Sequence, residues 1–334
     1  MGSFALYAKI DRDNTENNKD EEKQELVADI HFNLWNVSDS NQLFLDIGIM
    51  LENLDSRHSV FLYCPFSVKQ EDISDLGNLL SRDNRLLNAV FNENYSLLNR
   101  SKPKWAEVLT DSSPTPIFSI FTLDIGNNLT VQSMTTGGTK IQITIPSAST
   151  GEPYPKKIYV RFRIKSSKKQ VNLIRGYKNA VAFLTGLVKE CYVVDFRYND
   201  TRSFSDTELE EFTTDGKGFV ETRKLHFLLL CKAYIDVECS GDVKKREIEE
   251  GIWQEYVDHI DTTDIIAYHI SAKTPADKEK KDIGSWEFFA KQSVDFLGSR
   301  RAAKLLFWMI VIGCIINGTY DCLKSFASLL RYHG

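Results

Sequence analysis

The 334-residue chain lacks the short motifs that mark the common enzyme classes. It has no GxxxxGK(S/T) phosphate loop, no HExxH zinc motif and no GxSxG nucleophile elbow. These absences leave nucleotide hydrolysis, zinc proteolysis and serine hydrolysis without support. We therefore predict a protein that is not an enzyme, with no catalytic residue, no metal and no cofactor.

A disulfide framework is also absent. The cysteines form no CxxC pair and no pattern of paired spacings; they are Cys64, Cys191, Cys231, Cys239, Cys314 and Cys322. The first residues contain no basic stretch followed by a long apolar core, so no signal peptide is visible. Reduced thiols without a leader are typical of a cytosolic domain, which is what we expect here.

Charge is absent from one long stretch near the end of the sequence. No charged residue lies between Leu305 and Tyr320. A helix over residues 302–320 would be about 29 Å long, close to the thickness of the hydrocarbon core of a bilayer. Trp308 and Tyr320 near its ends are typical interfacial anchors. The sequence predicts a single transmembrane helix over residues 302–320, with a buried core helix as the alternative.

The residues beside this span predict its orientation. Arg300, Arg301 and Lys304 precede the apolar stretch, and they outnumber the basic residues that follow it closely. Positive residues accumulate on the cytoplasmic side of a membrane. We therefore expect a single-pass membrane protein in a lipid bilayer, with the large N-terminal part in the cytoplasm.

Polar and small residues within the span predict self-association. Asparagine can hydrogen-bond to a neighbouring helix, and glycine lets two helix backbones approach closely. We therefore expect a homo-oligomer held by a membrane helix whose candidate residues are Trp308, Gly313, Asn317 and Gly318.

Alternating hydrophobic patterns dominate the first half of the chain. They predict strands over residues 4–10, 26–35, 43–51, 59–64, 129–134 and 140–145. Gly137-Gly138 is a turn signal that joins the last two strands as a hairpin. Residues 72–81 have helical spacing. We predict an α+β fold in which residues 1–147 form a β-rich cytoplasmic domain.

The second half mixes the two periodicities. Strands are predicted over residues 158–165, 191–198, 224–237 and 264–271, and helices over residues 171–188 and 243–260. Residues 153–284 are thus predicted to form a second, α+β cytoplasmic domain. An amphipathic connecting helix at 286–301 and a short amphipathic tail at 321–334 are expected on either side of the transmembrane helix.

Acidic residues are missing from the segment between Pro153 and Lys189, which contains ten basic residues. Side chains alternate along a strand, so Tyr159, Arg161, Arg163 and Lys165 share one face of the predicted strand 158–165. Repulsion between neighbouring cations would be relieved by an anion. The predicted anion-binding residues are Tyr159, Arg161, Arg163, Lys165 and Lys168.

Two interpretations of this basic strand are open. In one it binds nucleic acid, a nucleotide, an anionic lipid or an acidic protein, with arginine contacting phosphate and Tyr159 stacking. In the other, acidic residues elsewhere in the fold neutralise the cations; the candidates are residues 11–25 and 206–211.

These features together suggest a membrane-anchored cytoplasmic sensor or effector that recognises an anionic partner and acts at the membrane through its C-terminal helix. The layout resembles that of prokaryotic immune (antiphage) effectors that disrupt the inner membrane when a cytosolic signal is sensed. One alternative is a passive membrane-tethered scaffold. Another is a membrane-tethered nuclease or hydrolase of unrecognised fold, whose candidate carboxylates would be Asp236 and Glu238.

Overall fold

The computed structural model describes residues 2–9, 25–37, 41–54, 59–98, 105–146, 155–177, 189–249, 251–257, 260–274, 282–295 and 299–332. The chain forms two compact units. Unit 1 comprises Met1–Arg175, Val193–Ala233 and Glu238–Ala290, and unit 2 comprises Gly176–Tyr192, Tyr234–Val237 and Lys291–Gly334.

The largest sheet has ten strands. Nine of them lie side by side in the order β17 (Lys244–Glu247), β18 (Ile265–Lys273), β15 (Glu221–Lys232), β2 (Val27–Asn36), β3 (Gln42–Glu52), β11 (Lys157–Ser167), β8 (Ser113–Phe121), β7 (Trp105–Thr110) and β6 (Tyr95–Leu98). The tenth, β5 (Ile73–Asp75), also pairs with β11. Most neighbours are antiparallel, but β15 runs parallel to β2 and β11 runs parallel to β8.

The central strands of this sheet have one face that is apolar over most of its length. Nine of its apolar side chains are no more than 1% exposed: Ile30, Phe32, Leu34, Ile47, Ile49, Val160, Phe162, Phe227 and Leu229. Phe4 and Phe196 pack on this face against Phe32, with ring centroids 5.1 and 4.7 Å away. Burying one such side chain stabilises the fold by about 1.5 to 3 kcal/mol, so this face forms a large part of the core.

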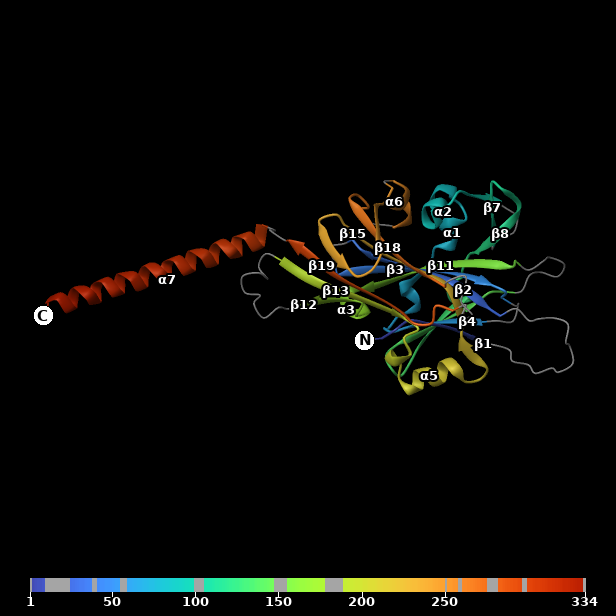
Figure 1. The fold of residues 1–334 in the computed structure, drawn as a ribbon, viewed down its shortest axis with the longest axis horizontal. Coiled ribbons are helices and arrows are strands. Elements are labelled where there is room, and N and C mark those ends of the chain that lie inside the picture. Colours follow the sequence, from blue (N-terminus) through green and yellow to red (C-terminus); the bar gives the residue numbers. More distant parts are fainter. Residues whose placement is uncertain are drawn as a thin grey trace. The chain divides into compact units, whose positions relative to one another are not determined.

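The opposite side of the same strands is polar. Strand alternation and register place together a set of side chains that we call the polar face: Asp29, His31, Asn33, Asp46, Gly48, Tyr159, Arg161, Arg163, Lys224 and His226. Helices α1 (Gly77–Leu80), α2 (Asn84–Phe91) and α6 (Ile252–Tyr256) lie together beside this sheet in Figure 1. Their apolar residues form one buried cluster with Trp35, Phe44 and Tyr159, so they cover part of the polar face.

A second sheet has five strands in the order β14 (Lys217–Phe219), β1 (Ala5–Lys9), β4 (Ser59–Cys64), β10 (Thr139–Thr144) and β9 (Leu129–Ser133). Helix α5 (Asp206–Thr213) covers one side of it, with Phe212 packed against Tyr7 and Tyr63. Ser205 and Glu208 cap the start of this helix through reciprocal hydrogen bonds.

The remaining strands form a four-stranded sheet in the order β12 (Ile174–Tyr177), β13 (Lys189–Tyr198), β19 (Trp286–Asp295) and β16 (Ile235–Cys239). The short helices are η1 (Gln70–Asp72), α3 (Lys168–Val171) and η2 (Thr201–Ser203). The longest element is α7 (Ser299–Tyr332), a single 34-residue helix that is drawn in red in Figure 1.

The predicted α+β class with a β-rich N-terminal part is confirmed, as are the 129–145 hairpin and most of the predicted strands. The ten-stranded sheet takes β3 from the first predicted domain and β11 and β15 from the second, so the boundary predicted at residues 147–153 does not separate two sheets. That boundary segment itself lies outside the described residues.

Four helix predictions are wrong in whole or in part, because apolar spacing over a short window fits both periods. The predicted helix 72–81 is strand β5 over residues 73–75 followed by the short helix α1. Residues 174–177 are a strand within the predicted helix 171–188, whose remainder from 178 lies outside the described residues. The helix predicted at 243–260 is strand β17 followed by the five-residue α6. The amphipathic connecting helix predicted at 286–301 is strand β19 over Trp286–Asp295. The strand predicted at 224–237 is two strands, since β15 ends at Lys232.

The absence of a side chain at Gly48 of β3 lets the Tyr159 and Arg161 side chains of β11 lie against the β3 backbone. Gly48 lies opposite Arg161 in the ladder, and a Cβ at this position would stand 2.1 Å from the Tyr159 hydroxyl and 3.1 Å from Nη1 of Arg161. Both of those side chains are buried and hydrogen-bonded, so neither can move away cheaply.

We therefore expect Gly48→Ala to lower the free energy of unfolding by about 1 to 3 kcal/mol, the usual cost of overpacking. Urea unfolding of the detergent-solubilised chain measures this. Gly176→Ala is the matched control, because its Cβ would meet only Tyr192 at an ordinary 3.8 Å. Equal stability of the two variants would contradict the proposed close approach.

Candidate functional site

The basic strand predicted as an anion-binding surface is β11, and most of it is buried. Tyr159, Arg161 and Arg163 are 0%, 1% and 6% exposed. The predicted alternation is correct, but the side of the strand expected to face solvent is covered by Tyr256 of α6 and its neighbours. The expectation that these three residues present themselves to solvent is therefore wrong.

Arg163 is neutralised by Asp46 of the adjacent strand β3. Its Nε donates to Oδ1 of Asp46 at 2.6 Å and its Nη2 to Oδ2 at 3.0 Å, a two-pronged pair typical of arginine and carboxylate. Asp46, fully buried, also accepts a hydrogen bond from the Trp35 indole at 2.7 Å. The backbone carbonyl of Tyr256 accepts from Arg163 Nη1 at 2.8 Å.

Arg161 is held by neutral oxygens. Its Nε donates to the Tyr256 hydroxyl at 2.6 Å and its Nη1 to the Tyr159 hydroxyl at 2.8 Å. The Asn33 amide, oriented so that its oxygen faces the guanidinium, accepts from Nη2 at 2.6 Å. Burial raises the pKa of Tyr159 and of Tyr256, so both phenols remain neutral.

Two guanidinium groups thus share one carboxylate within this cluster. Asp46 interacts electrostatically with both arginines but pairs directly with Arg163 alone. The Tyr256 ring lies 5.7 Å from the Arg161 guanidinium and 4.9 Å from that of Arg163, and its π face stabilises both cations. Of the two interpretations of the basic strand, internal pairing describes Arg163, although its partner is Asp46 rather than either predicted acidic stretch.

The other basic residues of the segment lie apart from this cluster. Lys165 is exposed over the Phe44 ring, and Lys168 is partly exposed at the start of α3. Lys157 pairs with Glu52. The acidic stretch 206–211 serves different partners, since Glu211 pairs with Lys140 and Lys217. Residues 11–24 lie outside the described part of the chain.

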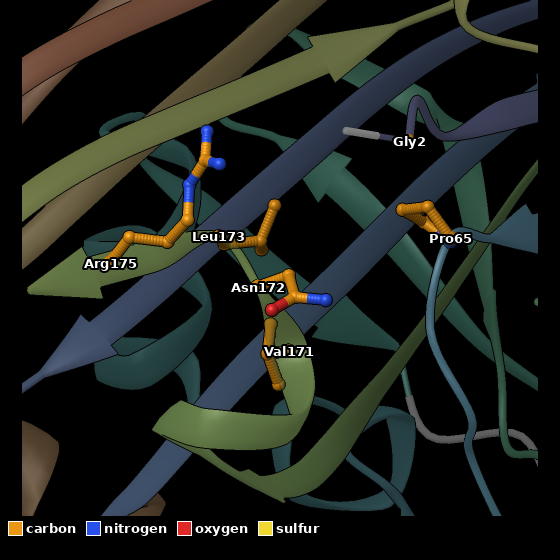
Figure 2. Close-up of a pocket in the computed structure, with 6 residues that line it drawn as sticks. All are labelled: Gly2, Pro65, Val171, Asn172, Leu173 and Arg175. Atoms are coloured by element: carbon orange, nitrogen blue, oxygen red, sulfur yellow. The ribbon is translucent and has the colours of Figure 1, made fainter.

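A small pocket opens next to this segment. Figure 2 shows Val171, Asn172, Leu173 and Arg175 on one side of it and Gly2 and Pro65 on the other. The Arg175 guanidinium also lies 3.9 Å from a carboxylate oxygen of Asp195. The pocket does not contain any of the predicted anion-binding residues.

The structure brings together three histidines that no local pattern in the sequence groups. His31, His226 and His269 come from β2, β15 and β18, and all are partly buried. Nδ1 of His226 lies 2.9 Å from Nε2 of His269, and the His31 ring stands edge-on to His226 with centroids 4.9 Å apart. Each lies on a strand that the sequence predicted. The parallel register between β2 and β15, which joins residues about two hundred apart, was not predictable from it.

These imidazoles are held neutral. Burial lowers the pKa of His226 to about 4, with the His269 ring, Lys273 and Lys224 adding to the effect. Burial also lowers the pKa of His269, helped by Lys244 and Arg246. Burial also lowers the pKa of His31 well below its usual range, with His226 and Arg161 contributing.

Helix α7 contains the predicted membrane span. Residues Leu306–Lys324 are long and apolar enough to cross a bilayer, and none of this segment is buried against the rest of the chain. This segment begins four residues after the predicted start and extends past Tyr320, so that Asp321 and Lys324 fall inside it. Because none of this window is buried, the predicted membrane span is favoured over the alternative of a buried core helix.

The C-terminal half of this span has polar residues on one side. On a helix of 3.6 residues per turn, a single stripe contains Gly313, Asn317, Tyr320, Asp321 and Lys324. Trp308 and Gly318, the other two predicted residues, lie off this stripe. Thr319 satisfies its hydroxyl on the Ile316 carbonyl, whereas the Asn317 amide has no hydrogen-bond partner among the described residues.

The candidate carboxylates Asp236 and Glu238 are exposed on β16. Among the residues that the structure describes, no group of three or more histidine, cysteine, aspartate or glutamate side chains is placed to hold a metal ion. Neither a protein-family model nor a curated protein matches this chain, so function is argued from the residues themselves.

We expect Asp46→Asn to destabilise the fold by about 3 to 5 kcal/mol, because it leaves two buried guanidinium groups without a carboxylate. Glu71→Gln is the matched control, since the Lys69–Glu71 pair is exposed and is expected to contribute less than about 1 kcal/mol. Both are measured by urea unfolding followed by tryptophan fluorescence. If Asp46→Asn lowers the free energy of unfolding no more than the control does, Asp46 does not stabilise the two buried arginines.

Proposed function

We propose that this protein is a single-pass membrane effector: a β-rich domain in the cytoplasm senses a signal, and the C-terminal helices of several copies assemble in the bilayer and act there. The observation that supports this most directly is α7. Its segment Leu306–Lys324 is long and apolar enough to cross a bilayer, none of it is buried, and its C-terminal half contains a polar stripe.

The depth of the stripe supports assembly. Asn317 lies two residues from the middle of Leu306–Lys324, or about 3 Å along the helix axis, and Asp321 lies about 9 Å from it. Both positions fall within a hydrocarbon core about 30 Å thick. An amide or a carboxylate there is costly unless it meets another helix or lines a polar cavity.

A second copy of the same helix supplies the matching groups. Asparagine amides both donate and accept, so Asn317 of two copies can bond to each other. Asp321 and Lys324 lie three residues apart on the same stripe, and a neighbouring copy would bring opposite charges together. Gly313 on this stripe permits close approach of the backbones.

The proposed orientation follows from the sequence beside the span. Arg300, Arg301 and Lys304 precede it, and the positive-inside rule then places the β-rich part in the cytoplasm. In this arrangement the large domain is available to a cytosolic signal, as in the antiphage effectors that the layout resembles.

An effector and a passive tether make different demands on the span. A tether requires only length and hydrophobicity, so a uniform leucine–alanine helix can replace it. An effector that works through assembly requires the polar stripe, because removal of an interhelical hydrogen bond weakens helix association by about 0.6 to 2 kcal/mol.

We expect expression of the full chain in bacterial cells to depolarise the inner membrane, and Asn317→Leu combined with Asp321→Leu to abolish most of that depolarisation. A voltage-sensitive dye reports the potential, with and without phage infection. Thr319→Val is the matched control, because it removes a polar group of the same helix that lies off the stripe.

Localisation must be measured in the same cells. Loss of depolarisation with unchanged membrane fractionation supports the effector. If the Asn317/Asp321 variant and a leucine–alanine replacement of residues 306–324 both behave as the unmodified chain does, the protein is a tether and the proposal is wrong.

A further inference from the structure

A cluster of basic side chains and imidazoles occupies the end of the polar face that the helices leave uncovered. In the register of β15, β18 and β17, Lys224 lies opposite Lys273, His226 opposite Ser271, and Lys244 opposite His269. Adjacent strands are about 4.8 Å apart, so these six side chains lie within one patch on one side of the sheet. Ser271, Lys224, Lys244 and Lys273 are exposed.

The patch has more positive than negative charge. Lys224 is compensated by Asp29 of β2 at 3.5 Å, and Arg246 by Glu249 at 3.5 Å. Among the described residues, Lys244 and Lys273 form no ion pair. Their effect on the neighbouring imidazoles shows that they act on the same small region: both lower the pKa of His269.

The imidazole pair adds hydrogen-bonding groups to these cations. One hydrogen bond joins Nδ1 of His226 to Nε2 of His269. Two neutral rings joined in this way keep one outer N–H donor and one outer lone pair, whichever ring donates. The Ser271 hydroxyl opposite His226 is a further donor. His31 closes the inner side, where its ring contacts Phe91 of α2.

We propose that this patch of Lys244, His269, His226, Ser271 and Lys273 binds a phosphate-bearing ligand. Two ammonium groups that form no ion pair with a described residue, next to imidazole and hydroxyl donors, are complementary to phosphate oxygens. A metal ion does not fit, because the surrounding charges are mostly positive and, in the part of the chain that the structure describes, no carboxylate joins the imidazoles. Phosphate binding at this patch would be the sensing step of the proposed function, and the biological meaning of the site rests on that function.

The probe is inorganic phosphate, added to the full chain in detergent micelles with carbon-13 at Cε1 of its six histidines. We expect saturable shifts of the His226 and His269 resonances. Lys273→Glu should weaken the apparent affinity about tenfold, the loss of one charge-assisted hydrogen bond. Lys169→Glu, an exposed lysine of α3 far from the patch in the sheet order, is the matched control and should leave the affinity unchanged.

Two further probes distinguish a free phosphorylated ligand from a phosphate-bearing lipid headgroup. ATP tests a free phosphorylated ligand, and vesicles of phosphatidylcholine with phosphatidic acid test a lipid headgroup. A response of His226 and His269 to either one, reduced by Lys273→Glu, supports the proposal and identifies the source. No shift with any probe, or shifts that Lys273→Glu and Lys169→Glu change equally, would overturn it.

The pH dependence of anion affinity tests independently whether the imidazoles contact the anion. A bound anion favours the imidazolium, so binding takes up a proton at any pH between the free pKa of His226, about 4, and its higher bound value. The charged and titratable groups around His226 are Lys224 on its own strand, His31 and Asp29 on β2, His269 and Lys273 on β18, and Lys244 and Arg246 on β17. Sulfate keeps its charge over this range, and we expect its affinity to rise as the pH falls from about 7 to about 5.

This binding assay is independent of the membrane experiment. Binding in micelles requires neither assembly nor depolarisation, and depolarisation by overexpressed chain requires no added phosphate. A negative result in the binding assay therefore does not contradict the proposed membrane function, and a negative depolarisation result does not contradict phosphate binding. A sulfate affinity that is constant with pH, or that rises equally in His226→Gln, would show that these imidazoles do not contact the anion.

Discussion

The structure depends on one constraint: a charged or hydrogen-bonding group removed from water must find a partner. The clearest case is Asp46, which sits between β2 and β11 and accepts hydrogen bonds from Trp35 and Arg163 at the same time. Through the Tyr256 carbonyl, Arg163 in turn ties α6 to the sheet. The apolar opposite face of the same strands forms a large part of the hydrophobic core, and the buried ion cluster fixes what can pack on the other side.

The same constraint distinguishes the two regions in which the sequence predicted function. On β11 the arginines found their partners inside the fold, so they explain packing rather than recognition. On α7 the Asn317 amide has none among the described residues. At the uncovered end of the polar face, Lys244 and Lys273 are exposed and form no ion pair with a described residue. Polar and charged groups that the fold does not pair internally are the better candidates for contact with a ligand or subunit.

The sequence was sufficient where a local pattern decides the outcome. Apolar segments rich in strand-forming residues identified β2, β3 and β4, and alternation identified β11. A glycine pair identified the β9–β10 hairpin, and sixteen uncharged residues identified the span. It also assigned Arg161 and Arg163 to the correct side of β11. It failed where short apolar spacing fits either period, as at β19, where Trp286 and Phe288 pack on Phe227 instead of on a helix partner.

The sequence could not show which residues distant in the chain would meet. Tyr256, about a hundred residues after Arg161, decides that this arginine is buried. The pairing of β15 with β2 decides that His226 lies against His31. Neither contact leaves a local signal, because both depend on strand order and register. A site made of side chains from three strands therefore becomes visible only once the sheet is assembled.

The central claim, that copies of α7 assemble along its polar stripe, is tested most directly by disulfide cross-linking in membranes. Cys314 and Cys322 are replaced by alanine, and one cysteine is placed in the helix by Ile310→Cys or by Ile312→Cys; the chain without either substitution reports the background from the other cysteines. Ile310 lies seven residues, about two turns, before Asn317 and shares its side, whereas Ile312 lies about 140° away. The proposed assembly predicts cross-linked dimers from Ile310→Cys and few from Ile312→Cys. Equal cross-linking at both positions, or none at either, would contradict it.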